Sequence, residues 1–264
     1  MTEHTPEYEI AELVWSAGAE KDRKDLDRAR LPLNDYGNGQ RLVSRFPKRL
    51  LHVDGIGWHV WDGTHWSVEA GEQEAVKLAH QTAQKISHEA RALAAFIDDI
   101  EKRPDEARAR ASYEQGLRKR VGFLRIWAIG SGDQGRIRAM LGAALPYLRV
   151  PARKMDTHKF LFNCRNCTLA FERGPQPKIR RRKHDPGDFL TRLAAVDYEP
   201  AALCPEWDRF IEDVQPNGDM AHYLQAMLGY TLTADTSEQK VHFLTGEGSN
   251  GKSTVIDTAS KLMG

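Results

Sequence analysis

Apolar side chains recur at helical spacing through much of the chain, most regularly in its first half. Between residues 71 and about 103 they return every three to four positions, which predicts one long amphipathic helix that Pro104 ends. Two further helices are predicted over 105–128 and 134–145, and a short one over 40–46. The first half of the chain is therefore expected to be mostly helical.

Short runs with high β-propensity interrupt this helical pattern and predict small antiparallel sheets. The runs are 50–53, 58–61, a strand that begins at Trp66, 159–163, 168–172 and 177–181. From Pro205 to Thr233 the spacing is helical again.

Residues 246–254 carry the clearest chemical motif of the sequence. They read Gly-Glu-Gly-Ser-Asn-Gly-Lys-Ser-Thr and contain the Gly-x4-Gly-Lys-Ser pattern of a phosphate-binding loop. The apolar, β-prone run 241–245 precedes them, and 253–263 follows with apolar residues at helical spacing. Strand, loop and helix in this order are the context that the motif requires.

In such a loop the glycines let backbone N–H groups point inward, so that the loop and the start of the helix hold phosphate oxygens. Lys252 would reach the β- and γ-phosphates, and the Ser253 hydroxyl would bind Mg²⁺ held by the nucleotide. The alternative, an ordinary glycine turn before a helix, is disfavoured by the context. We therefore expect ATP and Mg²⁺ as cofactors, bound by Gly246, Glu247, Gly248, Ser249, Asn250, Gly251, Lys252, Ser253 and Thr254.

Together these patterns predict an α+β fold. A mostly helical N-terminal domain with small antiparallel sheets is followed by the first strand, loop and helix of a truncated P-loop α/β ATPase domain. Four segments are expected, in chain order: a polar tail or loose helix over 1–33, an α+β domain over 34–200, a helical linker or collar over 201–240, and the start of the ATPase domain over 241–264.

Composition indicates the cellular compartment but does not identify a binding partner. The 264 residues carry a net charge of +1 and are 41% hydrophobic, which suits one or two packed domains. No leader pattern or membrane-length apolar stretch occurs, so a cytoplasmic protein without a membrane partner is expected. Three cysteines, an odd number, disfavour a disulfide framework.

Cys164 and Cys167 have the spacing of half a zinc site, and His184 follows them. A tetrahedral zinc site needs four ligands, and there is no second cysteine pair. We therefore favour two small buried thiols over a metal site.

Two features could contact nucleic acid. The densest positive run suggests phosphate contacts by Lys178, Arg180, Arg181, Arg182 and Lys183, although an exposed loop is an equal alternative. Trp58, Trp61 and Trp66 could stack on the bases of single-stranded DNA, but packing of a small sheet is the favoured reading.

The residues around the phosphate loop resemble one family. The segment resembles the approach to the ATPase core of phage and plasmid primase-helicases. The residues that carry this resemblance are Trp207, Phe210, Tyr223-Leu224-Gln225, Leu228–Thr233, Thr236–Lys240 and the loop with Asn250. These primase-helicases are superfamily 3 helicases related to the poxvirus primase-helicase. An upstream part of the chain resembles the domain that precedes the helicase in these proteins, at Trp58, Trp61-Asp62-Gly63, Trp66, Phe162-Asn163, Asn166 and Thr168-Leu169. It differs at Cys167, where the family usually has glycine.

This resemblance implies an AAA+-like ATPase in a homo-hexameric ring that moves along single-stranded DNA during phage or mobile-element replication, with primase and other replication proteins as partners. The sequence ends before any match to the acidic Walker B pair or the arginine finger, so the chain by itself is not expected to hydrolyse ATP. Two alternatives stay open: a short non-catalytic module for DNA binding or ring assembly, and an unrelated P-loop kinase.

Overall fold

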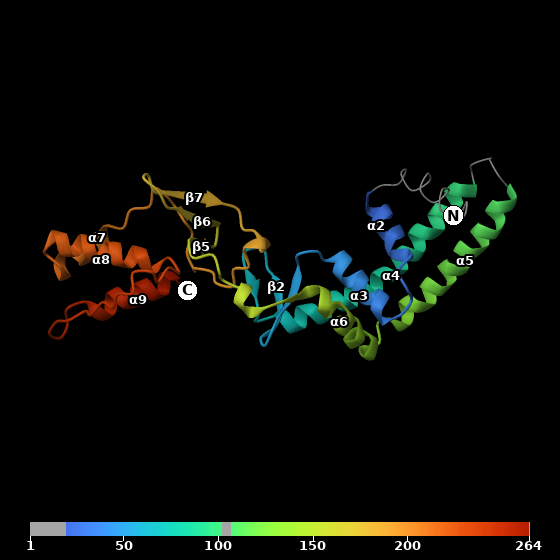
Figure 1. Cartoon of the computed structure of the whole chain (residues 1–264), viewed down its shortest axis with the longest axis horizontal. Coiled ribbons are helices and arrows are strands. Elements are labelled where there is room, and N and C mark those ends of the chain that lie inside the picture. Colours follow the sequence, from blue (N-terminus) through green and yellow to red (C-terminus); the bar gives the residue numbers. More distant parts are fainter. Residues whose placement is uncertain (1–19, 102–106, 264) are drawn as a thin grey trace, which may run out of the picture. The chain divides into compact units, whose positions relative to one another are not determined.

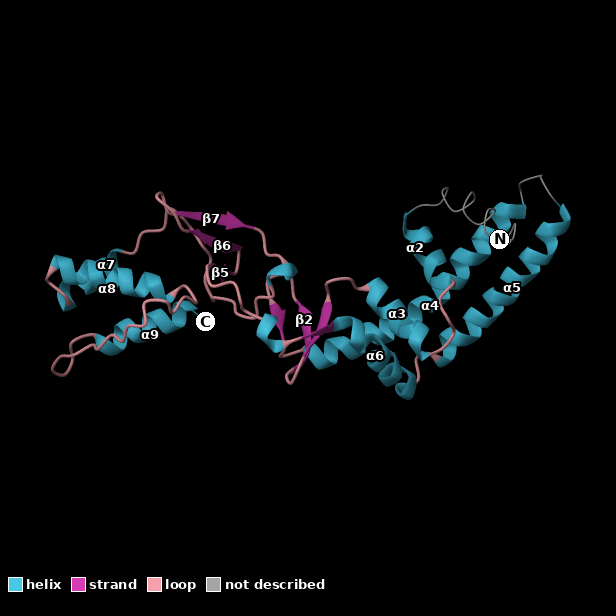
Figure 2. Ribbon diagram, in the orientation of Figure 1, coloured by secondary structure: helices cyan, strands magenta, loops and turns pink. Residues whose placement is uncertain are grey.

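The computed structural model describes residues 20–101 and 107–263, which form an α+β fold as predicted. They divide into two units, which are described separately. Of the described residues, the first unit comprises 20–60, 69–101 and 107–150, and the second comprises 61–68 and 151–263. Figures 1 and 2 show both units, with labels on the helices and on strands β2, β5, β6 and β7.

The first unit is built mainly from helices. They are α2 (Glu20–Ala29), α3 (Asp35–Arg45), α4 (Gly71–Glu101), α5 (Ala107–Gly130) and α6 (Gln134–Leu148). The long helix is thus confirmed, while the predicted break at Pro104 lies outside the described residues. Helix α6 does not stop before Pro146, as predicted, but includes this proline and ends at Leu148.

Helix α3 begins five residues before its predicted start. The Asn34 side chain caps it by accepting a hydrogen bond from the Gly37 N–H at 2.9 Å. Two glycines in its first turns weaken the helical signal, but close packing explains one of them. A Cβ on Gly39 would lie 2.9 Å from the Ala143 and Ala144 backbone of α6, so that only glycine lets these helices approach.

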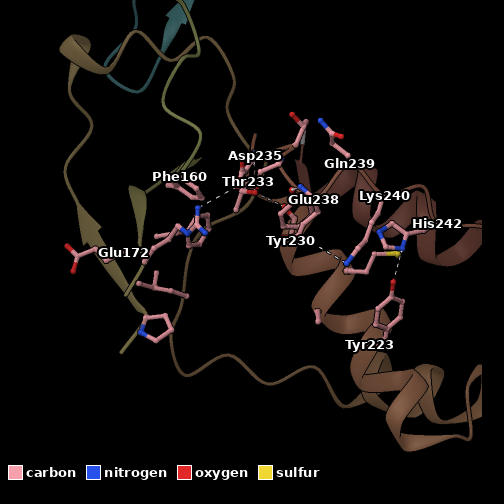
Figure 3. Close-up of a pocket in the computed structure, with 18 of the residues that line it drawn as sticks. Phe160, Glu172, Tyr223, Tyr230, Thr233, Asp235, Glu238, Gln239, Lys240 and His242 are labelled. Atoms are coloured by element: carbon pink, nitrogen blue, oxygen red, sulfur yellow. Dashed lines mark hydrogen bonds and ion pairs between the residues drawn. The ribbon is translucent and has the colours of Figure 1, made fainter. Parts of the chain in front are cut away.

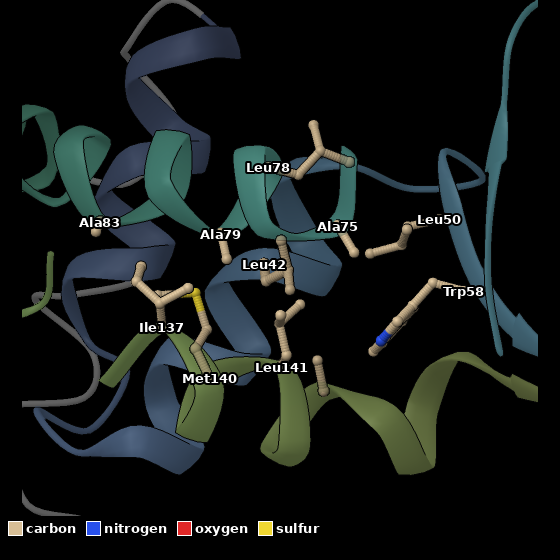
Figure 4. Close-up of a cluster of buried hydrophobic side chains, with 11 residues drawn as sticks. Leu42, Leu50, Trp58, Ala75, Leu78, Ala79, Ala83, Ile137, Met140 and Leu141 are labelled. Atoms are coloured by element: carbon tan, nitrogen blue, oxygen red, sulfur yellow. The ribbon is translucent and has the colours of Figure 1, made fainter. Parts of the chain in front are cut away.

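One hydrophobic core joins α3, α4 and α6 to the neighbouring strands (Figure 4). Strands β1 (Leu50–Val53) and β2 (Gly57–Trp61) pair antiparallel, with Leu50 opposite Val60. Strand β4 (Arg149–Val150), which sequence patterns missed because it has two residues, pairs parallel with β1. The buried members of this core are Leu42, Leu50, Trp58, Ala75, Leu78, Ala79, Ala83, Ile137, Met140, Leu141 and Ala144.

A second core lies between α2, α4 and α5, and a buried ion network borders it. The Glu89 carboxylate accepts hydrogen bonds from Arg41 at 2.8 Å and Arg45 at 2.7 Å, and Arg45 also pairs with Asp25 at 2.9 Å. Burial lowers the pKa of the Arg41 guanidinium, and the Glu89 charge opposes that shift. Of the predicted segment 1–33, residues 20–29 therefore form a packed helix, while 1–19 lie outside the described residues.

The second unit contains a three-stranded antiparallel sheet in the order β5-β6-β7. Its strands are β5 (Leu161–Cys164), β6 (Cys167–Glu172) and β7 (Lys178–Arg182). The short strand β3 (Trp66–Ser67) also belongs to this unit, where the Trp66 indole N–H donates to the Pro186 carbonyl at 2.9 Å. Trp58 and Trp66 are 7% and 3% exposed, so both pack inside their own units instead of offering a stacking surface.

The helices of the second unit follow its sheet. They are α7 (Pro205–Val214), α8 (Gly218–Thr231) and α9 (Lys252–Met263). The helical pattern over 205–233 is thus divided between α7 and α8. Asn217 caps the start of α8, because its side chain accepts hydrogen bonds from the N–H groups of Asp219 and Met220.

The strand predicted over 241–245 does not form. Val241 and Phe243 are 76% and 83% exposed, and none of the described residues pairs with this segment as a neighbouring strand. Its sequence is suitable for a strand, but a strand also needs a partner for its backbone N–H and C=O groups.

Within the described part of the chain, no helix has the length and apolar character needed to cross a membrane.

Candidate functional site

The glycine-rich loop turns sharply just before α9. Gly246 and Gly251 have φ angles of 155° and 81°, and Ser249 has a φ of 59° in the left-handed region. Gly246 has a second constraint, because a Cβ there would lie 1.9 Å from the Asn250 side-chain nitrogen. The backbone therefore requires glycine at both ends of the turn.

Lys252, the first residue of α9, binds the inside of this loop. Its ammonium donates to the Gly246 carbonyl at 2.9 Å, to the Glu247 carbonyl at 3.3 Å and to the Asn250 Oδ1 at 2.6 Å. One cation thus holds three oxygens of a five-residue stretch. Asn250, which a bare phosphate-loop pattern leaves unspecified, receives a structural role as the acceptor closest to Lys252.

Helix α7 supports the loop from behind. A Cβ on Gly251 would lie 2.6 Å from Val214 and 3.1 Å from the Phe210 ring. Trp207 and Phe210 contact each other on α7, with ring centroids 5.5 Å apart. The aromatic residues upstream of the motif therefore position its last glycine. Val255, in the first turn of α9, is buried.

The structure brings the predicted loop residues into one continuous turn and helix start. Glu247, Gly248, Ser249, Ser253 and Thr254 are exposed, so that the hydroxyls of Ser253 and Thr254 are accessible on the first turn of α9. This is the place where a helix N-terminus attracts anions.

The basic residues of β7, together with Lys183 directly after it, divide into two groups. Arg180 pairs with Glu172 at 2.8 Å, and Arg182 pairs with Asp188. Among the described residues, Lys178, Arg181 and Lys183 have no ion-pair partner, and all three are exposed. The run is a strand at the edge of a sheet, not a loop, and its three unpaired cations are the ones available to a polyanion.

A cavity of about 870 Å³ lies between this sheet and α8 (Figure 3). Sequence analysis missed it, although the segment Thr236–Lys240 that forms one wall belongs to the family resemblance. On the sheet side, the Arg173 guanidinium lies over the Phe160 ring at 5.2 Å. On the helix side, the Tyr223 hydroxyl and His242 Nδ1 are 3.1 Å apart. Aromatic rings and cations therefore share this cavity.

Asp235 fixes the turn that closes the cavity. Its carboxylate accepts hydrogen bonds from the Ser237 hydroxyl at 2.9 Å and from Lys159 at 3.3 Å. The hydrogen bond from Ser237, together with Lys159, holds the pKa of the Asp235 carboxyl below its usual range. The carboxylate therefore stays charged and keeps the turn in place.

Cys164 and Cys167 lie opposite each other across the tight β5–β6 turn and are both buried. Burial raises the pKa of the Cys164 thiol to about 11. His184 bonds instead to Asn163 at 2.9 Å and Thr168 at 3.1 Å, and the described residues contain no cluster of three side chains that could hold a metal. Cys167 has no left-handed φ, so this turn does not require the family's glycine.

Comparison with protein families identifies a match over the middle of the chain. None of the curated proteins compared with the sequence matches it. The family model described as D5 N terminal like matches residues 39–216, from α3 in the first unit to just beyond α7 in the second. Because this match covers more than half of the sequence, the chain belongs to the D5 N terminal like family, whose domain is the N-terminal part of phage-, plasmid- and poxvirus-type primase-helicase proteins that act in DNA replication.

Proposed function

We propose that the chain is the N-terminal part of an ATP-dependent replicative DNA helicase and that residues 246–254 bind Mg-ATP. The observation that carries the proposal is the position of the Lys252 ammonium, which lies inside the loop and donates hydrogen bonds to three of its oxygens. Family membership supports a role in replication. Together they favour a nucleotide-driven replication enzyme over an unrelated kinase.

The residues of the loop fit the triphosphate of ATP. Lys252 supplies a positive charge, the exposed loop offers backbone N–H groups, and the start of α9 adds its dipole. The Ser253 hydroxyl is an oxygen ligand of the kind that Mg²⁺ prefers. Bound Mg²⁺ would neutralise phosphate charge during phosphoryl transfer, while Lys252 and the loop hold the phosphates in place.

A titration with a fluorescent ATP analogue in Mg²⁺ tests this proposal. Lys252→Ala removes a charge-assisted hydrogen bond worth about 1.5–3 kcal/mol, so we expect affinity to fall about tenfold to hundredfold. Lys261→Ala, in the last turn of the same helix, is the matched control and should bind normally. Equal affinity of the Lys252→Ala protein and the unchanged chain would contradict the proposal.

Single-stranded DNA is the proposed polymer substrate of the same enzyme, in a homo-hexameric ring that works with primase and other replication proteins. The cations Lys178 and Arg181 of β7 and Lys183 directly after it support this partner, and so does the nearby cavity with its aromatic rings. Phosphates would contact the lysines and arginine, and bases would stack on aromatic side chains.

A non-catalytic DNA-binding or ring-assembly module is the second candidate function. It is favoured by the fact that the cations of β7 belong to a sheet whose strands, β5, β6 and β7, do not include the phosphate loop. DNA binding that persists unchanged in the Lys252→Ala protein, together with a failure to bind ATP in the unchanged chain, would select this function.

A further inference from the structure

The outward side of α5 carries an apolar stripe that nothing in the described structure covers. Phe123, Ile126 and Ile129 are 59%, 71% and 83% exposed. They follow one another at intervals of three residues and therefore lie along one side of the helix. The opposite side of α5 is different, since Val121 and Leu124 are buried in the second core. The exposed stripe is thus not needed to fold α5 onto α4.

A glycine in the same stripe points to close contact with another segment. Gly122 lies within the helix, where glycine destabilises by about 0.5–1 kcal/mol relative to alanine. A Cβ at this position would meet no atom within 4 Å, so no contact inside the described structure explains the glycine. A small residue between large apolar ones suits the close approach of a second backbone.

The charges beside the stripe are positive. Lys119 and Arg125 are exposed, and among the described residues neither forms an ion pair. Self-association through this face in a two-fold dimer would bring the same cations of two copies together, which is unfavourable. The complementary partner is therefore an acidic segment with large apolar side chains.

Residues 1–19 have this composition. They contain Glu3, Glu7, Glu9 and Glu12 and no lysine or arginine. Their large apolar residues are grouped in the same stretch, as Tyr8, Ile10, Leu13, Val14 and Trp15. Like the stripe on α5, the segment combines apolar side chains with charges of one sign, but the sign is opposite.

The segment is also attached within reach of the stripe. It leads directly into α2, whose last residue, Ala29, accepts a hydrogen bond from Arg120 of α5 at 3.0 Å. Arg120 is one helical turn from Phe123. Helix α2 is about 15 Å long, and 19 extended residues span about 60 Å. Residues 1–19 are therefore long enough to reach the stripe on α5.

We infer that residues 1–19 bind the outward face of α5 formed by Lys119, Gly122, Phe123, Arg125, Ile126 and Ile129. Burial of the apolar stripe stabilises the contact, and the glutamates place their charges beside Lys119 and Arg125. This inference is independent of ATP and DNA binding.

Thiol labelling of the full chain tests it. In a Cys204→Ser background, which removes the exposed cysteine, Ile126→Cys places a reporter in the stripe. We expect its labelling by a maleimide to become about tenfold faster when residues 2–19 are deleted, or when Glu7, Glu9 and Glu12 are changed to Gln, since docking worth about 1.4 kcal/mol is a factor of ten.

Ile56→Cys is the matched control, because Ile56 is 58% exposed in the β1–β2 turn of the same unit. Its labelling rate should be the same in all three chains. Equal rates at Ile126→Cys with and without residues 2–19 would overturn the inference. So would protection that persists in the deleted chain and increases with protein concentration, which would identify a second copy as the occupant.

Discussion

Single charged residues have very different energetic importance in this chain, depending on their burial. Glu89 is fully buried between the guanidinium groups of Arg41 and Arg45. Glu89→Ala leaves the buried Arg41 guanidinium without a counter-ion and removes one of the two carboxylates that pair with Arg45, so we expect a loss of about 3–5 kcal/mol in the free energy of unfolding. Denaturant unfolding followed by circular dichroism measures it. Glu74→Ala removes only an exposed pair with Lys77, and it should change stability by less than about 1 kcal/mol. A similarly small effect of Glu89→Ala would mean that the network contributes little.

At the scale of single elements, β7 provides the sharpest test of DNA contact. Changing Lys178, Arg181 and Lys183 together to Gln removes the three cations without ion-pair partners and leaves the pairs of Arg180 and Arg182 intact. Each lost phosphate contact should reduce the slope of log K against log salt by about 0.7 for single strands. Fluorescence anisotropy across a salt series measures this slope. An unchanged slope would mean that β7 does not contact DNA, and Lys77→Gln on α4 serves as the surface control.

The elements also show which features of the structure could be predicted from sequence patterns. Helix α4 was predictable because its apolar face repeats over 31 residues, and the phosphate loop because its glycines have fixed spacing. The 241–245 strand was predicted wrongly because local propensity does not reveal whether a neighbouring strand is present. The cavity beside α8 was missed because Phe160, Tyr223 and His242 come from distant positions in the sequence. Family resemblance indicated the segment that lines it, but not that it encloses a cavity.

At the scale of the whole molecule, each unit has buried clusters of its own, so ligand effects should be confined to the unit that binds. We expect calorimetry to resolve two unfolding transitions. Mg-ATP at 100 times its dissociation constant should stabilise the second unit by about 2.7 kcal/mol and leave the first unchanged. Lys252→Ala should abolish this shift, whereas Glu89→Ala should lower only the transition of the first unit. If Mg-ATP shifted both transitions equally, the units would unfold as one cooperative body, and binding at the loop would be coupled to the buried ion network around Glu89.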